Sequence, residues 1–231
     1  MPTDTQYVLS IDPGLSTGIA LLSYGDHPAQ LVEGWQFSGG VVGLKRWIED
    51  NWVQAGWDDY NDEPRLAGLR SPVGFLTTEP RWEYGETVPD DDGDVEYTET
   101  EIAPNLVVIA EKFTARNTKG FSYTTASLEP LRGEGALIAL DLMPDYTVKE
   151  KRWRDPGLQY LVGGEDLADK KKRQHAFLKD TGFYRTNKDF PDSPTKDGAD
   201  DYRSACAHGI AYIVKELKHR LTFGLLTDWS N

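Results

Sequence analysis

Residues 7–23 read YVLSIDPGLSTGIALLS, which is two short apolar runs joined by a turn rich in glycine, serine and threonine. The first run ends at Asp12, and the second begins at Gly18. Apolar runs separated by such a turn are typical of a β-hairpin. A third apolar run, at residues 31–37, is closed by a Ser-Gly-Gly sequence. We therefore expect the chain to open with three antiparallel strands.

The rest of the chain alternates between helical and extended patterns. A helix is predicted after the third strand, because four apolar residues approximate one helical stripe: Val42, Trp47, Ile48 and Trp52. Residues 106–110 read LVVIA, a continuous apolar run that predicts a strand buried on both faces and ending at Glu111. Helices are further predicted at residues 127–142, 169–179 and 199–221, and a strand at residues 146–149. This order of elements indicates an α/β fold.

The acidic residues are concentrated in one segment. Residues 58–104 carry 14 acidic and 3 basic side chains, a net charge of −11 out of −13 for the whole chain. The segment is rich in proline and has no sustained period, so we predict a partly flexible insertion within a single domain of residues 1–231. Residues 112–188, in contrast, carry 15 basic and 10 acidic side chains. Because polyanion binding depends on local positive charge, the total charge does not exclude a nucleic-acid ligand.

The composition excludes several classes of protein. The 231 residues include one cysteine, Cys206, which can form neither an intramolecular disulfide nor a thiolate zinc site. No run approaches the roughly 18 apolar residues of a membrane span, and the polar start MPTDTQ lacks the features of a signal peptide. We therefore expect a cytoplasmic protein with no membrane partner.

Four acidic residues stand where predicted strands end or where a predicted helix begins. Asp12 and Glu111 end strands, and Asp197 and Asp200 open the last helix. Each alone has an ordinary explanation as a turn, cap or solvated residue. Together, their order lets all four meet at one end of a sheet, where a divalent cation would relieve their mutual repulsion. Oxygen ligands favour Mg²⁺ or Mn²⁺ over Zn²⁺, and two such ions about 3.5–4 Å apart support phosphodiester hydrolysis.

Four sequence segments resemble the landmark motifs of the RuvC family of Holliday junction resolvases. They are IDPGLSTGIAL at residues 11–21, VVIAEKF at 107–113, LEPLRGEGALIAL at 128–140 and KDGADDYRSACAH at 196–208, in the family's order. The resemblance implies an RNase H-like fold with a mixed five-stranded sheet, in which two parallel strands follow the three antiparallel ones. It also implies a homodimer that uses two Mg²⁺ ions, for which Mn²⁺ can substitute, to nick two strands of a four-way DNA junction. The implied catalytic residues and metal ligands are Asp12, Glu111, Asp197 and Asp200.

The chain departs from the family pattern at three places. The insertion at residues 58–104 is longer than compact bacterial members need, which fits a divergent member such as a phage-borne one. Asp201 is an alternative ligand to Asp200, and we prefer Asp200 because the family pattern is Asp-x-x-Asp. Phe113 follows Glu111 at a spacing that differs from that of the family's stacking aromatic residue, so it is retained only as a DNA contact.

Basic and aromatic residues in two places are candidates for DNA contacts. They are Lys112, Phe113, Arg116 and Lys119 after Glu111, and Arg132, Lys170, Lys171, Lys172 and Arg173 on predicted helices. Cations in such positions contact phosphates and supply affinity without sequence information. Two alternatives stay open: a solvated helix with its own ion pairs for residues 170–173, and a dimer contact for Arg132. His208 is predicted to be a packed core residue rather than a ligand, and Ser16 to bond the backbone.

The expected function is metal-dependent cleavage of branched DNA, with four-way junctions ahead of flaps and forks. A catalytically inactive junction-binding scaffold is the first alternative. A phosphotransferase similar to actin or the sugar kinases is the second, because residues 12–18 also resemble their phosphate-binding turn. Those proteins need two such domains around the nucleotide, and this chain is too short for the pair. The sequence does not identify a protein partner for the acidic insertion.

Overall fold

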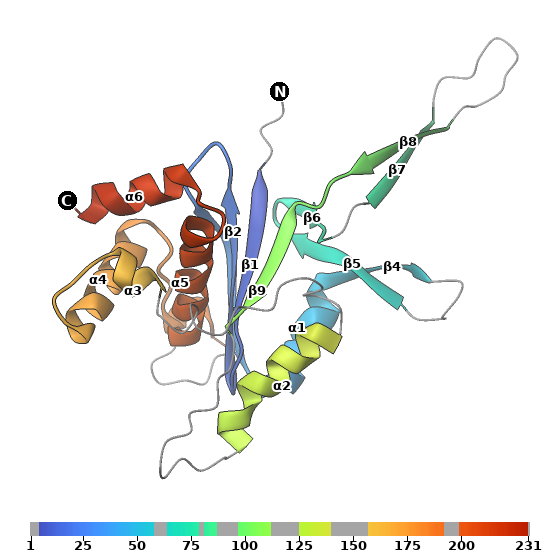
Figure 1. The fold of residues 1–231 in the computed structure, drawn as a ribbon. Coiled ribbons are helices and arrows are strands. Elements are labelled where there is room, and N and C mark those ends of the chain that lie inside the picture. The colour runs from blue at the N-terminus through green and yellow to red at the C-terminus, as the bar shows by residue number, and fades with distance from the viewer. Residues whose placement is uncertain are drawn as a thin grey trace, which may run out of the picture.

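The centre of the fold is a four-stranded mixed sheet with the strand order β3-β2-β1-β9 (Figure 1). The computed structural model describes residues 5–57, 64–78, 81–86, 97–111, 125–139, 157–191 and 199–230. The strands of this sheet are β1 (Gln6–Asp12), β2 (Ser16–Tyr24), β3 (Gln30–Ser38) and β9 (Leu106–Ala110). β2 is antiparallel to both β1 and β3, whereas β9 is parallel to β1. The α/β class and the four predicted strands are thus confirmed, and the strand predicted at residues 146–149 lies outside the described residues.

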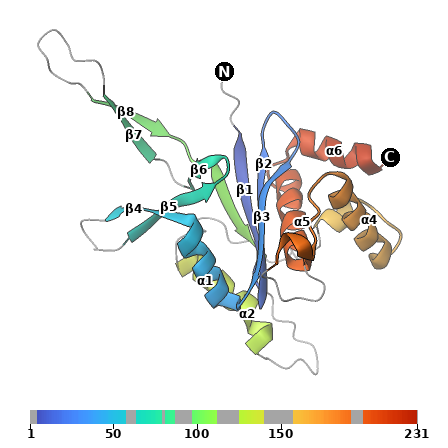
Figure 2. The same ribbon diagram turned by 180° about the vertical axis from the view of Figure 1, so that it is seen from behind.

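Helices cover both faces of this sheet (Figures 1 and 2). One face carries α5, and the other carries α1 and α2. The remaining short helices lie on the α5 side. Their bounds are α1 (Gly40–Asn51), α2 (Thr125–Ala139), α3 (Gly157–Leu161), α4 (Leu167–Asp180), the 3-10 helix η1 (Asn187–Asp189), α5 (Asp200–Lys215) and α6 (Arg220–Ser230). None of the helices in the described parts of the chain combines the length and apolar composition needed to cross a membrane.

The central strands are apolar because both of their faces are buried. In β1, Val8 packs into the cluster under α5, while Leu9 and Ile11 pack into the cluster under α1. In β9, Ile109 faces the first cluster and Val108 the second. Side chains alternate between the faces of a strand, so a strand that is covered twice must be apolar at nearly every position. This arrangement explains why the continuous LVVIA run is a strand.

Helix α2 is tied to the start of α1 through a buried carboxylate. The backbone N–H of Val41 donates to Glu129 Oε2 at 3.1 Å, and the Arg132 guanidinium lies 2.7 Å from Glu129 Oε1. These two hydrogen bonds lower the pKa of Glu129. The first N–H groups of a helix lack intrahelical partners, so Glu129 acts as an N-cap supplied by another helix. Gly40 leaves room for this carboxylate, because a Cβ at that position would overlap with it.

The segment predicted to be an irregular insertion contains strands. A three-stranded antiparallel sheet is formed by β4 (Trp52–Trp57), β5 (Pro64–Ser71) and β6 (Gly74–Leu76), and a hairpin is formed by β7 (Arg81–Glu86) and β8 (Tyr97–Ile102). Leu69 and Leu76 are fully or almost fully buried and join the α1-side cluster, so β5 and β6 are part of the core. The β7–β8 hairpin projects away from the main sheet (Figure 1).

Two predicted helix boundaries are wrong. The first predicted helix was expected to include Trp52, but α1 ends at Asn51 and Trp52 begins β4, buried against the core. Val42, which was expected on the buried stripe, is 66% exposed. The helix predicted at residues 199–221 is split into α5 and α6, and Lys218 between them adopts a left-handed φ of 53°. The break is held by His219, whose Nε2 lies 2.8 Å from the carbonyl oxygen of Gly25.

Candidate functional site

The site begins with the parallel pairing of β1 and β9. The register aligns Ile11 with Ala110, and the backbone N–H of Glu111 donates to the carbonyl of Ile11 at 2.9 Å. Asp12 and Glu111 are the next residues along the two strands, so both carboxylates emerge at the same end of the sheet. Parallel strands bring equivalent ends together, and residues at that end are a common location for ligand sites in α/β proteins.

The turn after Asp12 is fixed by hydrogen bonds to the start of α1 and by contact with α2. The carbonyl of Leu15 accepts hydrogen bonds from the N–H groups of Gly39 and Gly40, at 3.0 and 3.1 Å. A Cβ at Gly133 of α2 would lie 2.8 Å from Pro13 Cβ, so the helix backbone lies directly against the turn. Asp12 is therefore supported from both sides, which limits its movement.

Helix α5 supplies the third side of the site because it lies very close to β2 and β3. A Cβ at Gly18 of β2 would overlap with the backbone of Asp201, and a Cβ at Gly34 of β3 would overlap with the ring of Tyr202. The backbone N–H of Tyr202 donates to Gln36 Oε1 at 3.0 Å, which satisfies one of the free donors at the start of α5. These contacts fix the rotation of α5 about its axis, and hence which of its polar side chains face Asp12.

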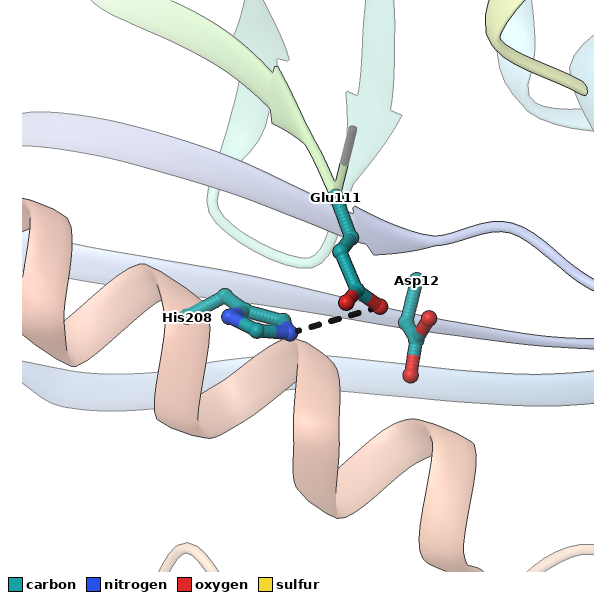
Figure 3. A group of neighbouring side chains, drawn as sticks. All are labelled: Asp12, Glu111 and His208. Atoms are coloured by element: carbon teal, nitrogen blue, oxygen red, sulfur yellow. Dashed lines mark ion pairs between the residues drawn. The ribbon is translucent and has the colours of Figure 1, made fainter. Parts of the chain in front are cut away.

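Three side chains converge at the centre of the site: Asp12 from the end of β1, Glu111 just after β9, and His208 from α5 (Figure 3). One donor atom of each lies within 4.8 Å of the others. His208 Nε2 is 3.7 Å from Glu111 Oε2, and the two side chains are 13% and 35% exposed. The site is thus partly shielded but open to solvent. Among the described residues, this is the group of acidic, histidine and cysteine side chains with the geometry to hold a metal ion.

Asp12 carries the strongest electrostatic perturbation in the site. Burial raises its pKa well above the usual range, and the negative charge of Glu111, a hydrogen bond shared with Glu111 and the charge of Asp201 raise it further. A hydrogen bond with Ser204 on α5 lowers it and is the one opposing influence. A carboxyl group in this environment is costly to ionise unless a positive charge is brought close. The site therefore has the electrostatics of a cation-binding site.

Asp201 is the second perturbed carboxyl of the site. Burial raises its pKa, as do the nearby charges of Asp200 and Glu111, whereas the Ser16 hydroxyl lowers it. The negative charge of Glu111 thus raises the pKa of Asp201, and the negative charge of Asp201 raises the pKa of Asp12. Asp201 lies farther out than the Asp12, Glu111 and His208 group, at the first turn of α5.

Asp200, which the sequence motif favoured as a ligand, lies on a different side of α5. Its carboxylate forms an ion pair with Arg203, and its side chain is 57% exposed. Arg203 is buried and also donates to the hydroxyl of Tyr184 at 2.7 Å. In this structure the charge of Asp201 raises the pKa of Asp12, and the charge of Glu111 raises that of Asp201, so the alternative ligand Asp201 becomes the one we propose. Asp197 lies outside the described residues.

Some side chains of the predicted DNA-contact residues are bound to other parts of the protein, and others face solvent. Arg132 is paired with Glu129, Lys170 lies 4.6 Å above the ring of Tyr160, and Arg173 Nε donates to the carbonyl of Val162 at 2.9 Å. Lys171 and Lys172 are exposed on α4. Lys112, Phe113, Arg116 and Lys119 lie outside the described residues. The four-cation run on α4 is thus divided between side chains that contact the protein and side chains that face solvent.

His208 and Ser204 are the site residues that sequence analysis missed. His208 was predicted to be a packed core residue, and Ser204 was not singled out. With Asp201 they occupy positions 201, 204 and 208, a spacing of three and four residues that places side chains on one helix face. Had Asp201 been chosen as the ligand, this spacing would have brought both residues into the predicted site.

Comparisons with protein-family models, with curated proteins and with solved structures find no match to this chain. The resemblance to the RuvC family therefore rests on the four sequence segments quoted above. The functional assignment depends on the geometry of the carboxylates and on the chemistry that this geometry permits.

Proposed function

We propose that this protein is a divalent-metal-dependent endonuclease that acts on branched DNA, with four-way junctions as the preferred substrate. The observation that carries the proposal is the convergence of Asp12, Glu111 and His208 from three separate elements of the fold, with Asp201 near enough for its charge to raise the pKa of Asp12. Repelling carboxylates at the end of a parallel strand pair have no evident structural purpose. They are the donor set that Mg²⁺ or Mn²⁺ requires.

The arrangement of the sheet supports the proposed RNase H-like fold. Three antiparallel strands are followed by a parallel strand beside the first one, which is the arrangement that the resemblance implies for the first four strands. The α5 helix then crosses the sheet with its first turn at the carboxylates. Fold alone does not determine function, so the proposal depends on the site.

Different residues of the chain would bind the ions, orient the ligands and contact the phosphates. Asp12 and Glu111 would hold the ion position at the sheet end, and Asp201 would complete the donor set from α5. Ser204 orients Asp12 through a hydrogen bond. Divalent ions in such a site supply Lewis-acid stabilisation of phosphoryl oxygens and activate water for in-line attack. Phosphate contacts would come from exposed cations such as Lys171 and Lys172 on α4, next to α5.

A homodimer is part of the proposal, because paired nicks on symmetric strands need two centres related by a two-fold axis. Light scattering of the purified protein tests this assignment independently of activity. A monomer would leave the cleavage chemistry intact but would favour flaps or forks over four-way junctions as substrates.

The proposal is tested by cleavage of a labelled four-way junction, beside duplex, flap and fork controls, in Mg²⁺, Mn²⁺ or EDTA. Asp12→Asn is the blank, and we expect it to lose cleavage by about 10³-fold, since a metal centre contributes several kcal/mol to the transition state. Junction binding, measured by gel shift in Ca²⁺, should persist in this variant. Metal-independent cleavage, or cleavage by the variant at the wild-type rate, would refute the proposed site. Tight binding without any cleavage would favour the scaffold alternative.

A further inference from the structure

We infer that His208 is a direct metal ligand, and that it gives one ion position of the centre a mixed oxygen and nitrogen donor set that selects Mn²⁺ over Mg²⁺. This inference rests on the proposed metal centre and goes beyond it, because the ligands proposed for that centre are carboxylates alone. It assigns a role to a histidine that neither the strand ends nor the Asp-x-x-Asp pattern indicates.

The first step is geometric. Bonds of about 2.1 Å from a shared ion place neighbouring donor atoms about 3–4 Å apart. His208 Nε2 and Glu111 Oε2 are 3.7 Å apart, and the donor atom of Asp12 lies within 4.8 Å of both. The His–Glu separation is longer than a hydrogen bond; it gives an ion pair when the imidazole is protonated, and it suits two ligands of one ion when the imidazole is neutral. Figure 3 shows the imidazole of His208 facing the carboxylate of Glu111, with the carboxylate of Asp12 beside them.

The second step concerns how His208 is held. It lies on α5 immediately before Gly209, where a Cβ would press against Leu22 and Ser10 of the sheet. The helix backbone is therefore in direct contact with β1 and β2 beside the imidazole. His208 is also seven positions after Asp201, on the same face of α5. The close packing that orients Asp201 therefore also presents His208 to Asp12 and Glu111.

The third step is the choice of metal. Mg²⁺ prefers oxygen ligands and water, whereas imidazole is a ligand for transition-metal ions. Between these two ions, a site of two carboxylates and one imidazole therefore favours Mn²⁺ over Mg²⁺. A centre that used only Asp12, Glu111 and Asp201 would not make this distinction.

The experiment is pulsed EPR of the full-length protein loaded with Mn²⁺, together with calorimetric titrations of Mn²⁺ and Mg²⁺. An imidazole ligand gives a nitrogen hyperfine coupling to bound Mn²⁺, which a nearby but non-coordinating histidine does not give at that strength. The chain has four histidines, so the assignment needs variants. His208→Ala should lose the coupling and weaken Mn²⁺ binding by about tenfold or more, while Mg²⁺ binding changes much less.

His175→Ala is the matched control, because His175 is an exposed histidine on the neighbouring helix α4 and should retain the coupling and the affinity. His208→Gln, with circular dichroism, separates loss of a ligand from loss of the fold. Wild-type protein that binds Mn²⁺ without nitrogen coupling, and a His208→Ala variant with unchanged affinity, would overturn the inference and leave the carboxylate centre intact. Wild-type protein that binds neither ion would overturn the proposed metal centre itself.

Discussion

Two polar faces of helix α5 use the same kinds of residue and differ in how their charges are balanced. On the sheet side, His208 lies beside Asp12 and Glu111, and burial together with the charges of neighbouring carboxylates raises the pKa of Asp12 and of Asp201. On the α4 side, Asp200 is neutralised by Arg203 one turn away. The second face already contains its cation, whereas the first face gathers three carboxyl groups around one histidine, His208, which lies 3.7 Å from Glu111. This difference is the reason for proposing the cation site on the sheet side.

The largest expected effect on cleavage comes from replacing one carboxylate on each face of α5 with an amide. Asp201→Asn should reduce metal-dependent junction cleavage by about 10²-fold or more, because it removes an oxygen donor from a centre worth several kcal/mol. Asp200→Asn should change cleavage by less than about threefold, because its carboxylate serves an ion pair that is half-exposed. The two variants differ by one position and have the same chemistry, so each is the control for the other.

Initial rates at saturating Mg²⁺ with a labelled four-way junction measure this difference. Equal losses in the two variants would mean that the two faces are not functionally distinct. A larger loss for Asp200→Asn would restore the Asp-x-x-Asp assignment and would imply that α5 is rotated when DNA is bound.

The α4 side of α5 should contribute stability rather than activity. Arg203 is buried, donates to the Tyr184 hydroxyl at 2.7 Å and stacks 4.9 Å above the Tyr184 ring. Arg203→Ala should therefore lower the free energy of unfolding by about 1–3 kcal/mol, the range for a lost charged hydrogen bond in a buried network. Urea denaturation measures this change.

Lys45→Ala is the control for the α4-side prediction. Lys45 forms an (i, i+4) pair with Glu49 at 3.5 Å, and both side chains are more than half exposed. Such pairs contribute about 0.5 kcal/mol or less. A loss for Arg203→Ala no larger than that of this exposed pair would show that the Arg203 network has no special role in holding the segment after α4 against α5.

The sequence predicted the parts of the fold that depend on burial. The LVVIA run became β9 at the predicted residues because both faces of that strand are covered. Trp52 continued the helical spacing of α1 yet begins β4, because its burial against the core is equally satisfied by an extended chain. No glycine or proline marks the break between α5 and α6 in the sequence, and Lys218 adopts the left-handed conformation there. Tertiary contacts decided these boundaries, and local patterns do not encode them.

The candidate site was predictable to the extent that strand ends determine it. Asp12 and Glu111 follow directly from two apolar runs and a parallel register. The choice between Asp200 and Asp201 depends on the rotation of α5, which is set by the close approach to Gly18 and by the Tyr202–Gln36 hydrogen bond. These contacts join residues more than 160 positions apart, and no spacing rule within the helix could supply them. His208 was missed for the same reason.

The smallest effect tests the charge imbalance of the sheet side directly. The pKa of Asp12 is higher in the folded state than in the unfolded state, where it is about 4. At pH values below about 4, this carboxyl therefore stabilises the folded state. That contribution is lost as the pH rises through the raised folded pKa. Asp12→Asn, measured in EDTA, should therefore unfold at nearly the wild-type temperature at about pH 4 and about 2–4 °C higher at neutral pH.

Added Mg²⁺ should reverse this order at neutral pH, since a ligand that binds only the folded state stabilises the wild type and not the variant. Asp189→Asn is the control of opposite sign. Backbone and side-chain hydrogen bonds from Thr186 lower the pKa of Asp189, so its contribution is present above the unfolded pKa and is lost as the pH falls. A variant at position 12 that is less stable than the wild type at every pH in EDTA would show that the two carboxyls attract each other by sharing a proton. The sheet side of α5 would then be balanced without a cation, and the contrast between its two faces would disappear.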